Sequence, residues 1–293
     1  MSPSTRGHPL VVGSRARTHA ERLVSRDGYF RPESVIRRFG NSPVTPFLGG
    51  GAAVLLQVAH PLVAAGVARH SDFDRDLWRR LVRTLRALYL MAFGTKAEAE
   101  WAGEVVRAVH AHVAGATTSQ LGRFPAGTRY SASDPELMLW VHATLVRSSL
   151  AAYERFVQSL AREEEERYYR EMRVVAELFG TPASIIPRSL AEFEEYMEAA
   201  LAGPTLSVTP PARKVAAVIF EADLPAPMRL LVPAHRLATA GLLPPRLREE
   251  YGLRWTPLHA AALPLAARSL RLAAAPVLFA ASRVAPLPEL RAA

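Results

Sequence analysis

The sequence predicts an all-α fold built as a single domain. Apolar residues recur at helical spacing along the chain, and the strict alternation of apolar and polar residues that is typical of half-buried strands is essentially absent. The 293 residues are 49% apolar and 22% charged, which is the balance of a soluble globular protein with a large core. Because no internal repeat divides the chain, we expect an N-terminal arm at residues 1–45 and one helical domain at residues 46–293.

The first long helix follows a stretch rich in proline and glycine. Residues 34–51 hold two prolines and three successive glycines, which predict a turn region. Residues 52–69 are almost wholly apolar, so this helix should be buried on all sides. Pro61 lies in the middle of this helix and has no backbone N–H to donate, so the helix should bend at His60.

An amphipathic helix is expected at Asp74–Phe93, because leucines recur there at helical spacing and Gly94 follows. Thr95 can cap the next helix, which should reach Gly115. Residues 116–133 combine Gly, Ser, Thr and Pro, which predicts a loop.

Start signals mark another helix from Asp134 to Val157. Asp134 is a capping residue, Pro135 suits the first helical position, and Glu136 brings negative charge to the first turn. Further helices are expected at 163–179 (closed by Gly180), 189–201 and 211–221, and the region 225–286 should be helical but interrupted by prolines.

The chain has no cysteine, which narrows the classes of site. Disulfides, thiolate zinc sites, iron–sulfur clusters, covalently attached c-type haem and Cys-ligated haem are all excluded. The N-terminus lacks the apolar run of a signal peptide, and no segment reaches the ~20 apolar residues of a spanning helix. A cytoplasmic location is therefore expected.

The net charge of +9 is weak support for nucleic-acid binding. Only Lys96 and Lys214 among the 36 basic residues are lysines, which indicates a coding bias toward arginine. Since no nucleic-acid-binding module is recognisable, no nucleic-acid partner is expected. Basic ends around an acidic middle leave peripheral membrane contact and homo-oligomerisation open.

Several polar side chains lie on or beside helix faces that should be buried, and such groups need a partner. Arg80, Arg83 and Thr84 share one face, because residues three and four apart are neighbours on a helix. Arg107 and His110 share a face of the next helix in the same way. A haem fits this set, since it needs one imidazole for the iron, cations for its propionates and a polar group near its open face.

The remaining histidines give further candidates. His60, His70 and His142 could supply a hydrogen bond or a proton near such a cofactor. His112 lies two residues from His110, so the two side chains point away from each other and cannot both face one site.

Structural roles stay open for all of these residues. The arginines could be solvated or paired with acids of the same region (Asp72, Asp74 and Asp76), and Thr84 could bond back to a backbone carbonyl. Each histidine could be an ordinary hydrogen-bonded residue. Other enzyme templates fit less well, because the chain has no H-E-x-x-H, G-x-S-x-G, P-loop or G-x-G-x-x-G motif and no Glu-x-x-His pair of a di-iron site.

Taken jointly, the stretches that carry these residues are specific enough to indicate a protein family. They read L-L-Q-V-A-H-P-L-V-A-A-G-V-A-x-H-S, R-L-V-R-T, R-A-V-H-A-H-V-A-G and Y-S-A-S-D-P-E-L-M-L-W-V-H-A-T-L-V. With them, the chain resembles the MpaB/rubber-oxygenase (latex-clearing protein) family over about Pro46 to Gly180. This resemblance implies a globin-like helical domain with a central pocket for one non-covalent b-type haem.

The resemblance also implies site residues. The family's iron-ligand element, Arg-x-x-His, falls on Arg107 and His110. Its Arg-x-x-Lys-Thr pattern falls on Arg80, Arg83 and Thr84, where Arg83 replaces the lysine and keeps the charge but not the shape. The carboxylate that rubber-cleaving members use as a base has no clear counterpart here, so polyisoprene cleavage is not implied.

The sequence therefore predicts a haem b-dependent oxygenase acting on an apolar substrate of small to medium size, with O₂ bound at the iron. The expected cofactor residues are His110 as iron ligand with Arg107, Arg80 and Thr84, and the expected catalytic residues are Arg83, Thr84, His60 and His142. Two alternatives remain open. One is a non-catalytic haem-binding sensor or carrier, and the other is a haem-free helical structural or membrane-surface protein.

Overall fold

The computed structural model describes residues 27–70, 77–221 and 232–281, with the backbone alone at 77–81, 221 and 273–281. Helices and one small antiparallel sheet make up this part of the chain, so the predicted all-α class is confirmed. The elements are α2 (Val35–Gly40), α3 (Val44–Ala59), α4 (Pro61–His70), α5 (Leu77–Phe93), α6 (Lys96–Ala111), β1 (Ala114–Ala116), β2 (Arg129–Ser131), α7 (Pro135–Phe156), α8 (Arg162–Phe179), α9 (Leu190–Ala202), α10 (Pro210–Glu221), α12 (Val232–Leu242), α13 (Pro245–Glu250) and α14 (Pro257–Ala281).

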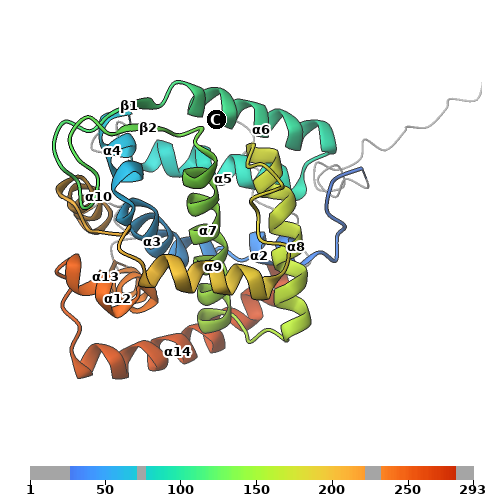
Figure 1. The fold of residues 1–293 in the computed structure, drawn as a ribbon. Coiled ribbons are helices and arrows are strands. Elements are labelled where there is room, and N and C mark those ends of the chain that lie inside the picture. Colours follow the sequence, from blue (N-terminus) through green and yellow to red (C-terminus); the bar gives the residue numbers. More distant parts are fainter. Residues whose placement is uncertain (1–26, 71–76, 222–231, 282–293) are drawn as a thin grey trace, which may run out of the picture.

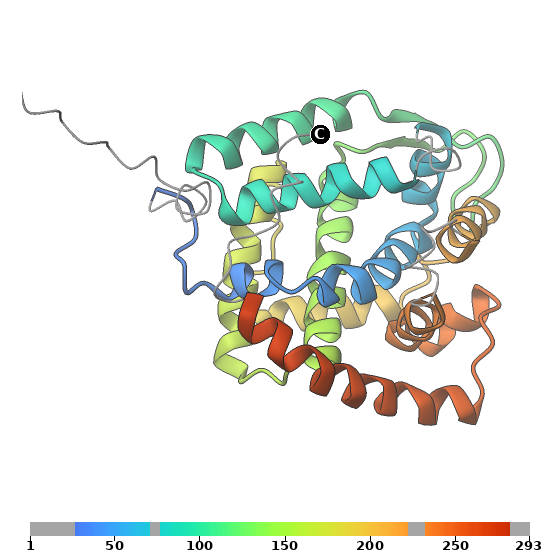
Figure 2. The same cartoon turned by 180° about the vertical axis from the view of Figure 1, so that it is seen from behind.

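The antiparallel pair of α3 and α7 forms the centre of the fold. In Figure 1 and Figure 2, α7 runs down through the middle, α5 and α6 lie across its upper end, and α14 follows the lower edge. Trp140 Nε1 donates to the carbonyl of Gln57 at 3.2 Å, where the end of α3 meets α7. Near the other end, a β-carbon added to Gly49 would lie 2.9 Å from the Ala152 side chain, so the two helices need glycine there to approach so closely.

The predicted bend at His60 is confirmed. α3 ends at Ala59 and α4 begins at Pro61, and the two helices are bent by 106°. The backbone of His60 is extended, with φ −78° and ψ 117°. α3 is buried through most of its length, whereas residues 68–70 at the end of α4 are exposed, so burial on all sides holds only for the first part of the predicted helix.

Among the described residues, no single helix has both the length and the apolar composition needed to cross a membrane. The pair of α3 and α4 meets these requirements only when its two members are counted together across their bend.

Three helix ends follow their predicted signals, but the helix expected to reach Gly115 ends at Ala111, because Ala114–Ala116 pair with Arg129–Ser131 as a strand. Thr95 Oγ1 accepts from the Glu98 backbone N–H at 3.2 Å, and the Glu98 carboxylate accepts from the Thr95 N–H at 2.8 Å, which completes a capping box at the start of α6. Asp134 caps α7 by accepting from two backbone N–H groups. Gly180 ends α8 in the left-handed region with φ 98°, a conformation that favours glycine.

The turn region predicted at residues 34–51 is instead mostly helical, because tertiary contacts stabilise it. Phe39 on α2 stacks on both Tyr153 and Tyr168, with ring centroids 4.0 and 4.1 Å apart. Glu171 on α8 accepts hydrogen bonds from the first backbone N–H groups of α2. None of these partners is close in sequence, so the local prediction of a turn was wrong.

Two further differences concern elements that local patterns did not predict. The loop expected at 116–133 contains β2, which pairs with β1 so that Gly115 faces Tyr130. The proline-containing C-terminal region includes one continuous helix, α14, with Pro264 and Pro276 inside it. Pro264 is exposed, so the carbonyl that loses its donor there can bond water instead.

The boundary between an arm and a domain at residues 45 and 46 stays a prediction, and so does the globin-like character of the core. Residues 1–26 of the predicted arm lie outside the described residues. The same holds for residues 71–76, at the start of the predicted second helix, and for residues 225–231 and 282–286 of the proline-containing region.

Replacing Phe39 should destabilise the fold strongly. Phe39→Ala removes a buried ring and two stacking contacts, so the free energy of unfolding should fall by about 3–5 kcal/mol. Urea unfolding followed by circular dichroism measures this change. Leu258→Ala, at a side chain that is 75% exposed, is the control and should change stability by less than about 0.5 kcal/mol. Equal losses in both variants would contradict a core role for α2.

Candidate functional site

The α5–α6 hairpin brings the two basic motifs to the same level. The chain reverses at Gly94 and Thr95, between two helices that contact each other, so residues equally distant from this turn lie opposite one another. Arg80–Thr84 on α5 is therefore level with Val105–Val109 on α6, one residue before His110.

The α5 motif faces outward in the part that the structure describes, so the expectation that Arg83 and Thr84 accompany a buried face was wrong. Arg83 and Thr84 are both exposed, and the side chain of Arg80 lies outside the described residues. Exposed cations on the hairpin can meet an acidic group such as a propionate without first breaking a buried ion pair.

The two neighbouring histidines of α6 differ as their spacing predicted. His110 is half-buried, and its Nδ1 atom is shielded from solvent. His112 is exposed, and its Nδ1 lies 2.7 Å from the backbone carbonyl of Ala108. His110 is therefore the histidine of this pair that is turned toward the body of the protein.

Arg107 ties α6 to the end of α8. Its guanidinium donates to the carbonyl of Leu178, the last but one residue of α8. A β-carbon added to Gly180 would lie 2.8 Å from the Arg107 Cδ atom and 3.5 Å from the Met138 Cε atom, so these two side chains meet in the space beside that glycine. α6, α7 and the end of α8 thus converge at one junction.

His142 lies one helical turn from Met138 on the same face of α7, so it points to the same side of the helix as that junction. The side chain is only 5% exposed, and neither ring nitrogen has a hydrogen-bond partner among the described residues. A buried polar group left without a partner costs about 1–3 kcal/mol. Among the described residues, His142 is therefore the strongest candidate for a hydrogen bond to a bound ligand.

Burial sets the charge of His142. Loss of solvation lowers the pKa of its imidazole from 6.5 to about 4, with no charged neighbour contributing. The ring is therefore neutral at pH 7, with one nitrogen that donates and one that accepts a hydrogen bond.

His60 lies at the bend before α4 and His70 at the end of α4, and each ring has a partner within the protein. His60 Nδ1 accepts from the Leu62 backbone N–H at 3.3 Å, and burial lowers its pKa to about 4, opposed by Asp134. His70 Nε2 lies 3.4 Å from the hydroxyl of Tyr130 on β2.

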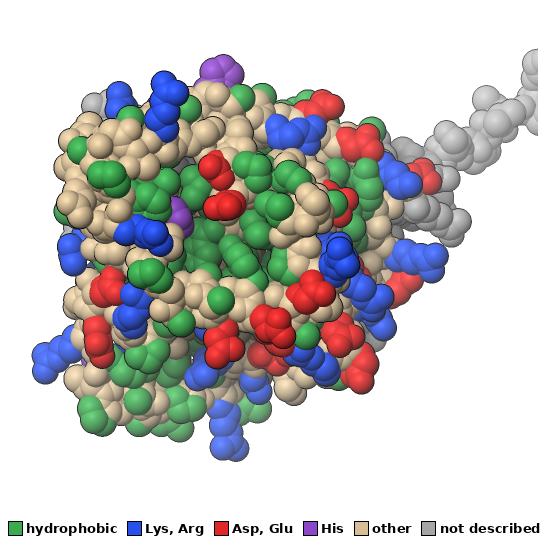
Figure 3. All heavy atoms as spheres, viewed as in Figure 1, with side chains coloured by type: hydrophobic (Ala, Val, Ile, Leu, Met, Phe, Trp, Pro, Cys, Tyr) green, Lys and Arg blue, Asp and Glu red, His purple; other side chains and the backbone are tan. Residues whose placement is uncertain are grey.

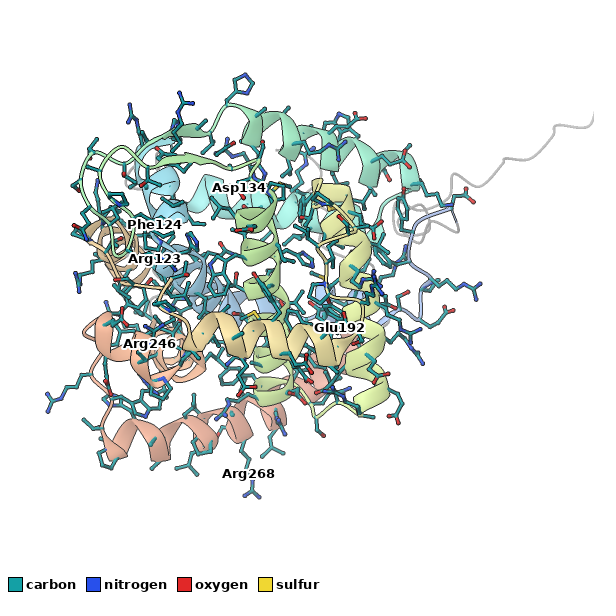
Figure 4. All side chains as sticks on the ribbon, in the orientation of Figure 1. Arg123, Phe124, Asp134, Glu192, Arg246 and Arg268 are labelled. Atoms are coloured by element: carbon teal, nitrogen blue, oxygen red, sulfur yellow. The ribbon has the colours of Figure 1, made fainter. Side chains whose placement is uncertain are left out.

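A hollow opens in front of α7. Figure 3 shows that this face of the molecule is hollowed there and that the floor of the hollow is hydrophobic. Asp134 and Phe124 lie at its margin, as labelled in Figure 4, and the ring of His60 packs against Phe124 with centroids 5.5 Å apart. His60 therefore lies next to an apolar surface that is exposed on this face of the protein.

Two residues of α7 were not singled out from the sequence. Met138 contacts the α6–α8 junction, and its signal was its position four residues before His142. Arg147 is half-buried on α7; burial lowers the pKa of its guanidinium, and no charged neighbour offsets this. A single arginine in the apolar stretch of a central helix was the signal for that residue.

Within the ranges that the structure describes, no group of three or more His, Asp or Glu side chains could hold a metal ion unaided. This finding has no bearing on a haem, because the porphyrin supplies four ligands to the iron and a single imidazole from the protein is enough to hold it.

Comparison with known families decides the relationship of the chain. The model of the ER-bound oxygenase mpaB/B′/rubber oxygenase catalytic domain matches residues 37–275. The chain belongs to this family. The resemblance noted in the sequence is confirmed, and the match continues beyond Gly180, where the recognisable motifs end. The chain is therefore an oxygenase catalytic domain by family.

Two relatives support the relationship without adding a function. Uncharacterized proteins of Mycobacterium bovis and Mycobacterium tuberculosis are each 27% identical over 214 residues, which cover 70% of this chain and 79% of theirs. No solved structure matches the chain significantly.

The stability of the protein should fall between about pH 6.5 and pH 4 because of His142. Its pKa is 6.5 in the unfolded chain and about 4 in the folded one, so the unfolded state takes up the proton first as the pH falls. The contribution is fully present above pH 6.5, and about 3 kcal/mol of it should be lost by pH 4.

Urea unfolding of the cofactor-free protein and of His142→Leu, from about pH 8 to about pH 4, measures this loss. His60 titrates in the same direction, so the difference between wild type and variant isolates His142. His112→Gln, at an exposed site, should follow the wild type. A wild type and a His142→Leu variant that lose stability in parallel would contradict a buried neutral imidazole.

Proposed function

We propose that the protein is a haem b-dependent oxygenase that acts on an apolar substrate of small to medium size. The observation that carries the proposal is the buried imidazole of His142, without a partner for either nitrogen, in a chain of an oxygenase family. A partner for such a group must come from outside the described protein atoms, and a cofactor with its bound substrates is one source.

The residues on the α5–α6 hairpin and on α7 fit a haem in their chemistry. The half-buried imidazole of His110 would be the iron ligand, and its neighbour Arg107 is a cation on the same helix. Arg83 and Thr84 offer a second cation and a hydroxyl at the same level of α5. Haem b, when bound, would supply an iron centre able to bind and activate dioxygen.

The chain's own side chains divide the remaining tasks. Arg107 bonds to the Leu178 carbonyl and so fixes the angle of α6, which makes it a positioning residue for His110. Arg80 and Arg83 would pair with the propionates, and Thr84 would hydrogen-bond at the cofactor edge. The substitution of arginine for the family's lysine leaves position 83 unable to coordinate iron, because a guanidinium keeps its proton.

His142 would serve the reaction as a neutral group. Because its pKa is about 4, it can donate one hydrogen bond and accept another at pH 7, but it brings no positive charge into the pocket. His60 has a similarly lowered pKa and lies beside the hydrophobic hollow, so it is the second candidate for a proton relay near the substrate. The apolar floor of that hollow supports an apolar substrate.

A haem-binding sensor or carrier is the second candidate function, and the same observation favours it. If His142 as well as His110 were to hold the iron, the protein would supply two ligands and no site would be left for O₂. Carbon monoxide binding to the reduced protein separates the two functions, because it requires an open position.

Protein produced with a supply of haem should show a Soret band that depends on His110. His110→Ala should lose the band, because the imidazole that holds the iron is gone. His112→Ala, two residues along on the exposed side of α6, is the matched control and should keep it. Ultraviolet–visible spectra and the pyridine haemochrome measure both.

The outcomes distinguish the candidates. A band together with carbon monoxide binding supports the oxygenase, and a band without it supports the carrier. Loss of the band in His142→Ala, but not in His110→Ala, would assign the iron ligand to His142 on α7 in place of His110. A protein that takes up no haem would overturn both functions.

A further inference from the structure

In the part of α14 whose side chains are described, one face of the helix packs against the protein. Leu263, Ala267 and Leu270 pack into a small hydrophobic cluster with residues of α3, α7 and α12. Arg271 donates to the backbone carbonyl of Arg155 at 3.0 Å and also to that of Glu154, which secures the helix near the end of α7. The inner face of α14 thus packs against the protein.

The outer face of α14 carries a line of exposed leucines. Leu258, Leu265 and Leu272 are 75%, 66% and 71% exposed, and each follows the previous one after seven residues. Residues seven apart lie almost directly above one another on a helix, so the three form one stripe about 21 Å long. Single exposed leucines are common on protein surfaces, but a straight row of three along one helix is an apolar strip, and no described residue covers it.

An apolar groove borders the inner face of the same helix. A depression of about 300 Å³ lies along α14, lined by Leu237 of α12 and by Leu263 and Leu270 of α14. Leu263 and Leu270 belong to the inner face of α14, so the groove lies between α14 and its neighbours and is separate from the strip.

The charges around the strip have one sign. The sequence from residue 251 to residue 288 contains Arg254, Arg268, Arg271 and Arg283 and no Asp or Glu. Arg254 and Arg268 are exposed, and Arg268 extends away from the protein beside the strip, as labelled in Figure 4. An apolar strip on a segment whose charged residues are all arginines is complementary to a surface that is apolar beneath and negative above.

We propose that the outer face of α14 lies on a membrane surface that contains anionic lipids. The leucines would enter the boundary between headgroups and acyl chains, and Arg254 and Arg268 would pair with the headgroup phosphates. The helix would lie flat on the surface, because its inner face stays attached to the protein. This contact is independent of haem binding and of the proposed oxygenase activity.

A second copy of the chain fits this face less well. Leucines seven apart also suit a paired helix, but a second α14 offers Arg268 no carboxylate to pair with. The two copies would bring like charges together along the strip, whereas anionic headgroups neutralise them. Charge therefore favours the lipid surface.

The test is co-sedimentation of the full-length protein with vesicles of phosphatidylcholine, with and without phosphatidylglycerol. The wild type should bind the vesicles that contain phosphatidylglycerol, and added salt should weaken binding because it screens the arginines. The triple variant Leu258→Ser, Leu265→Ser, Leu272→Ser should bind these vesicles at least about tenfold more weakly. Arg268→Gln should reduce the preference for phosphatidylglycerol. All three leucines are exposed, so the thermal melt should stay that of the wild type.

A matched control comes from another exposed apolar pair. Val105 and Val109 on α6 are 43% and 57% exposed, and Val105→Ser with Val109→Ser should leave vesicle binding unchanged. Loss of binding in that control but not in the leucine variant would overturn the proposal. The proposal would also be overturned if the wild type bound neither kind of vesicle. The same holds if light scattering showed a dimer that the leucine variant converts to a monomer, while the wild type binds no vesicles.

Discussion

The close antiparallel packing of α3 against α7 is the constraint on which the rest of the structure depends. Gly49 allows the two helices to approach, and the Trp140 indole ties α7 to the end of α3. α3 must end there because Pro61 follows, so α4 leaves at a bend of 106°. This one pair of helices therefore sets both the bend that carries His60 and the central helix that carries His142.

The candidate site takes its geometry from the same central helix. Met138 of α7 and Arg107 of α6 meet beside Gly180, so the position of His110 is coupled to α7 through the end of α8. His142, one turn further along α7, has apolar surroundings that keep its ring neutral. A neutral imidazole can recognise a polar ligand without adding a net charge to the core.

The two surfaces to which we assign roles lie on different elements. The proposed cofactor residues belong to α5, α6 and α7, whereas the exposed leucines belong to α14, which follows the opposite edge of the molecule from α6 (Figure 1). Association through α14 would therefore leave α6 uncovered. Because α14 is attached through its inner face to α3 and α7, contact at its outer face needs no rearrangement of the core.

The sequence by itself determined the helices whose ends carry local signals and the family motifs that they bear. Thr95, Asp134 and Gly180 act through backbone groups within a few residues, so their effect could be read without a fold. Tertiary structure alone decided that α2 is a helix, since Phe39 stacks on rings more than a hundred residues away. It also decided that His142 is buried without hydrogen bonds, because burial depends on which distant helices meet, and periodicity within one helix cannot specify that.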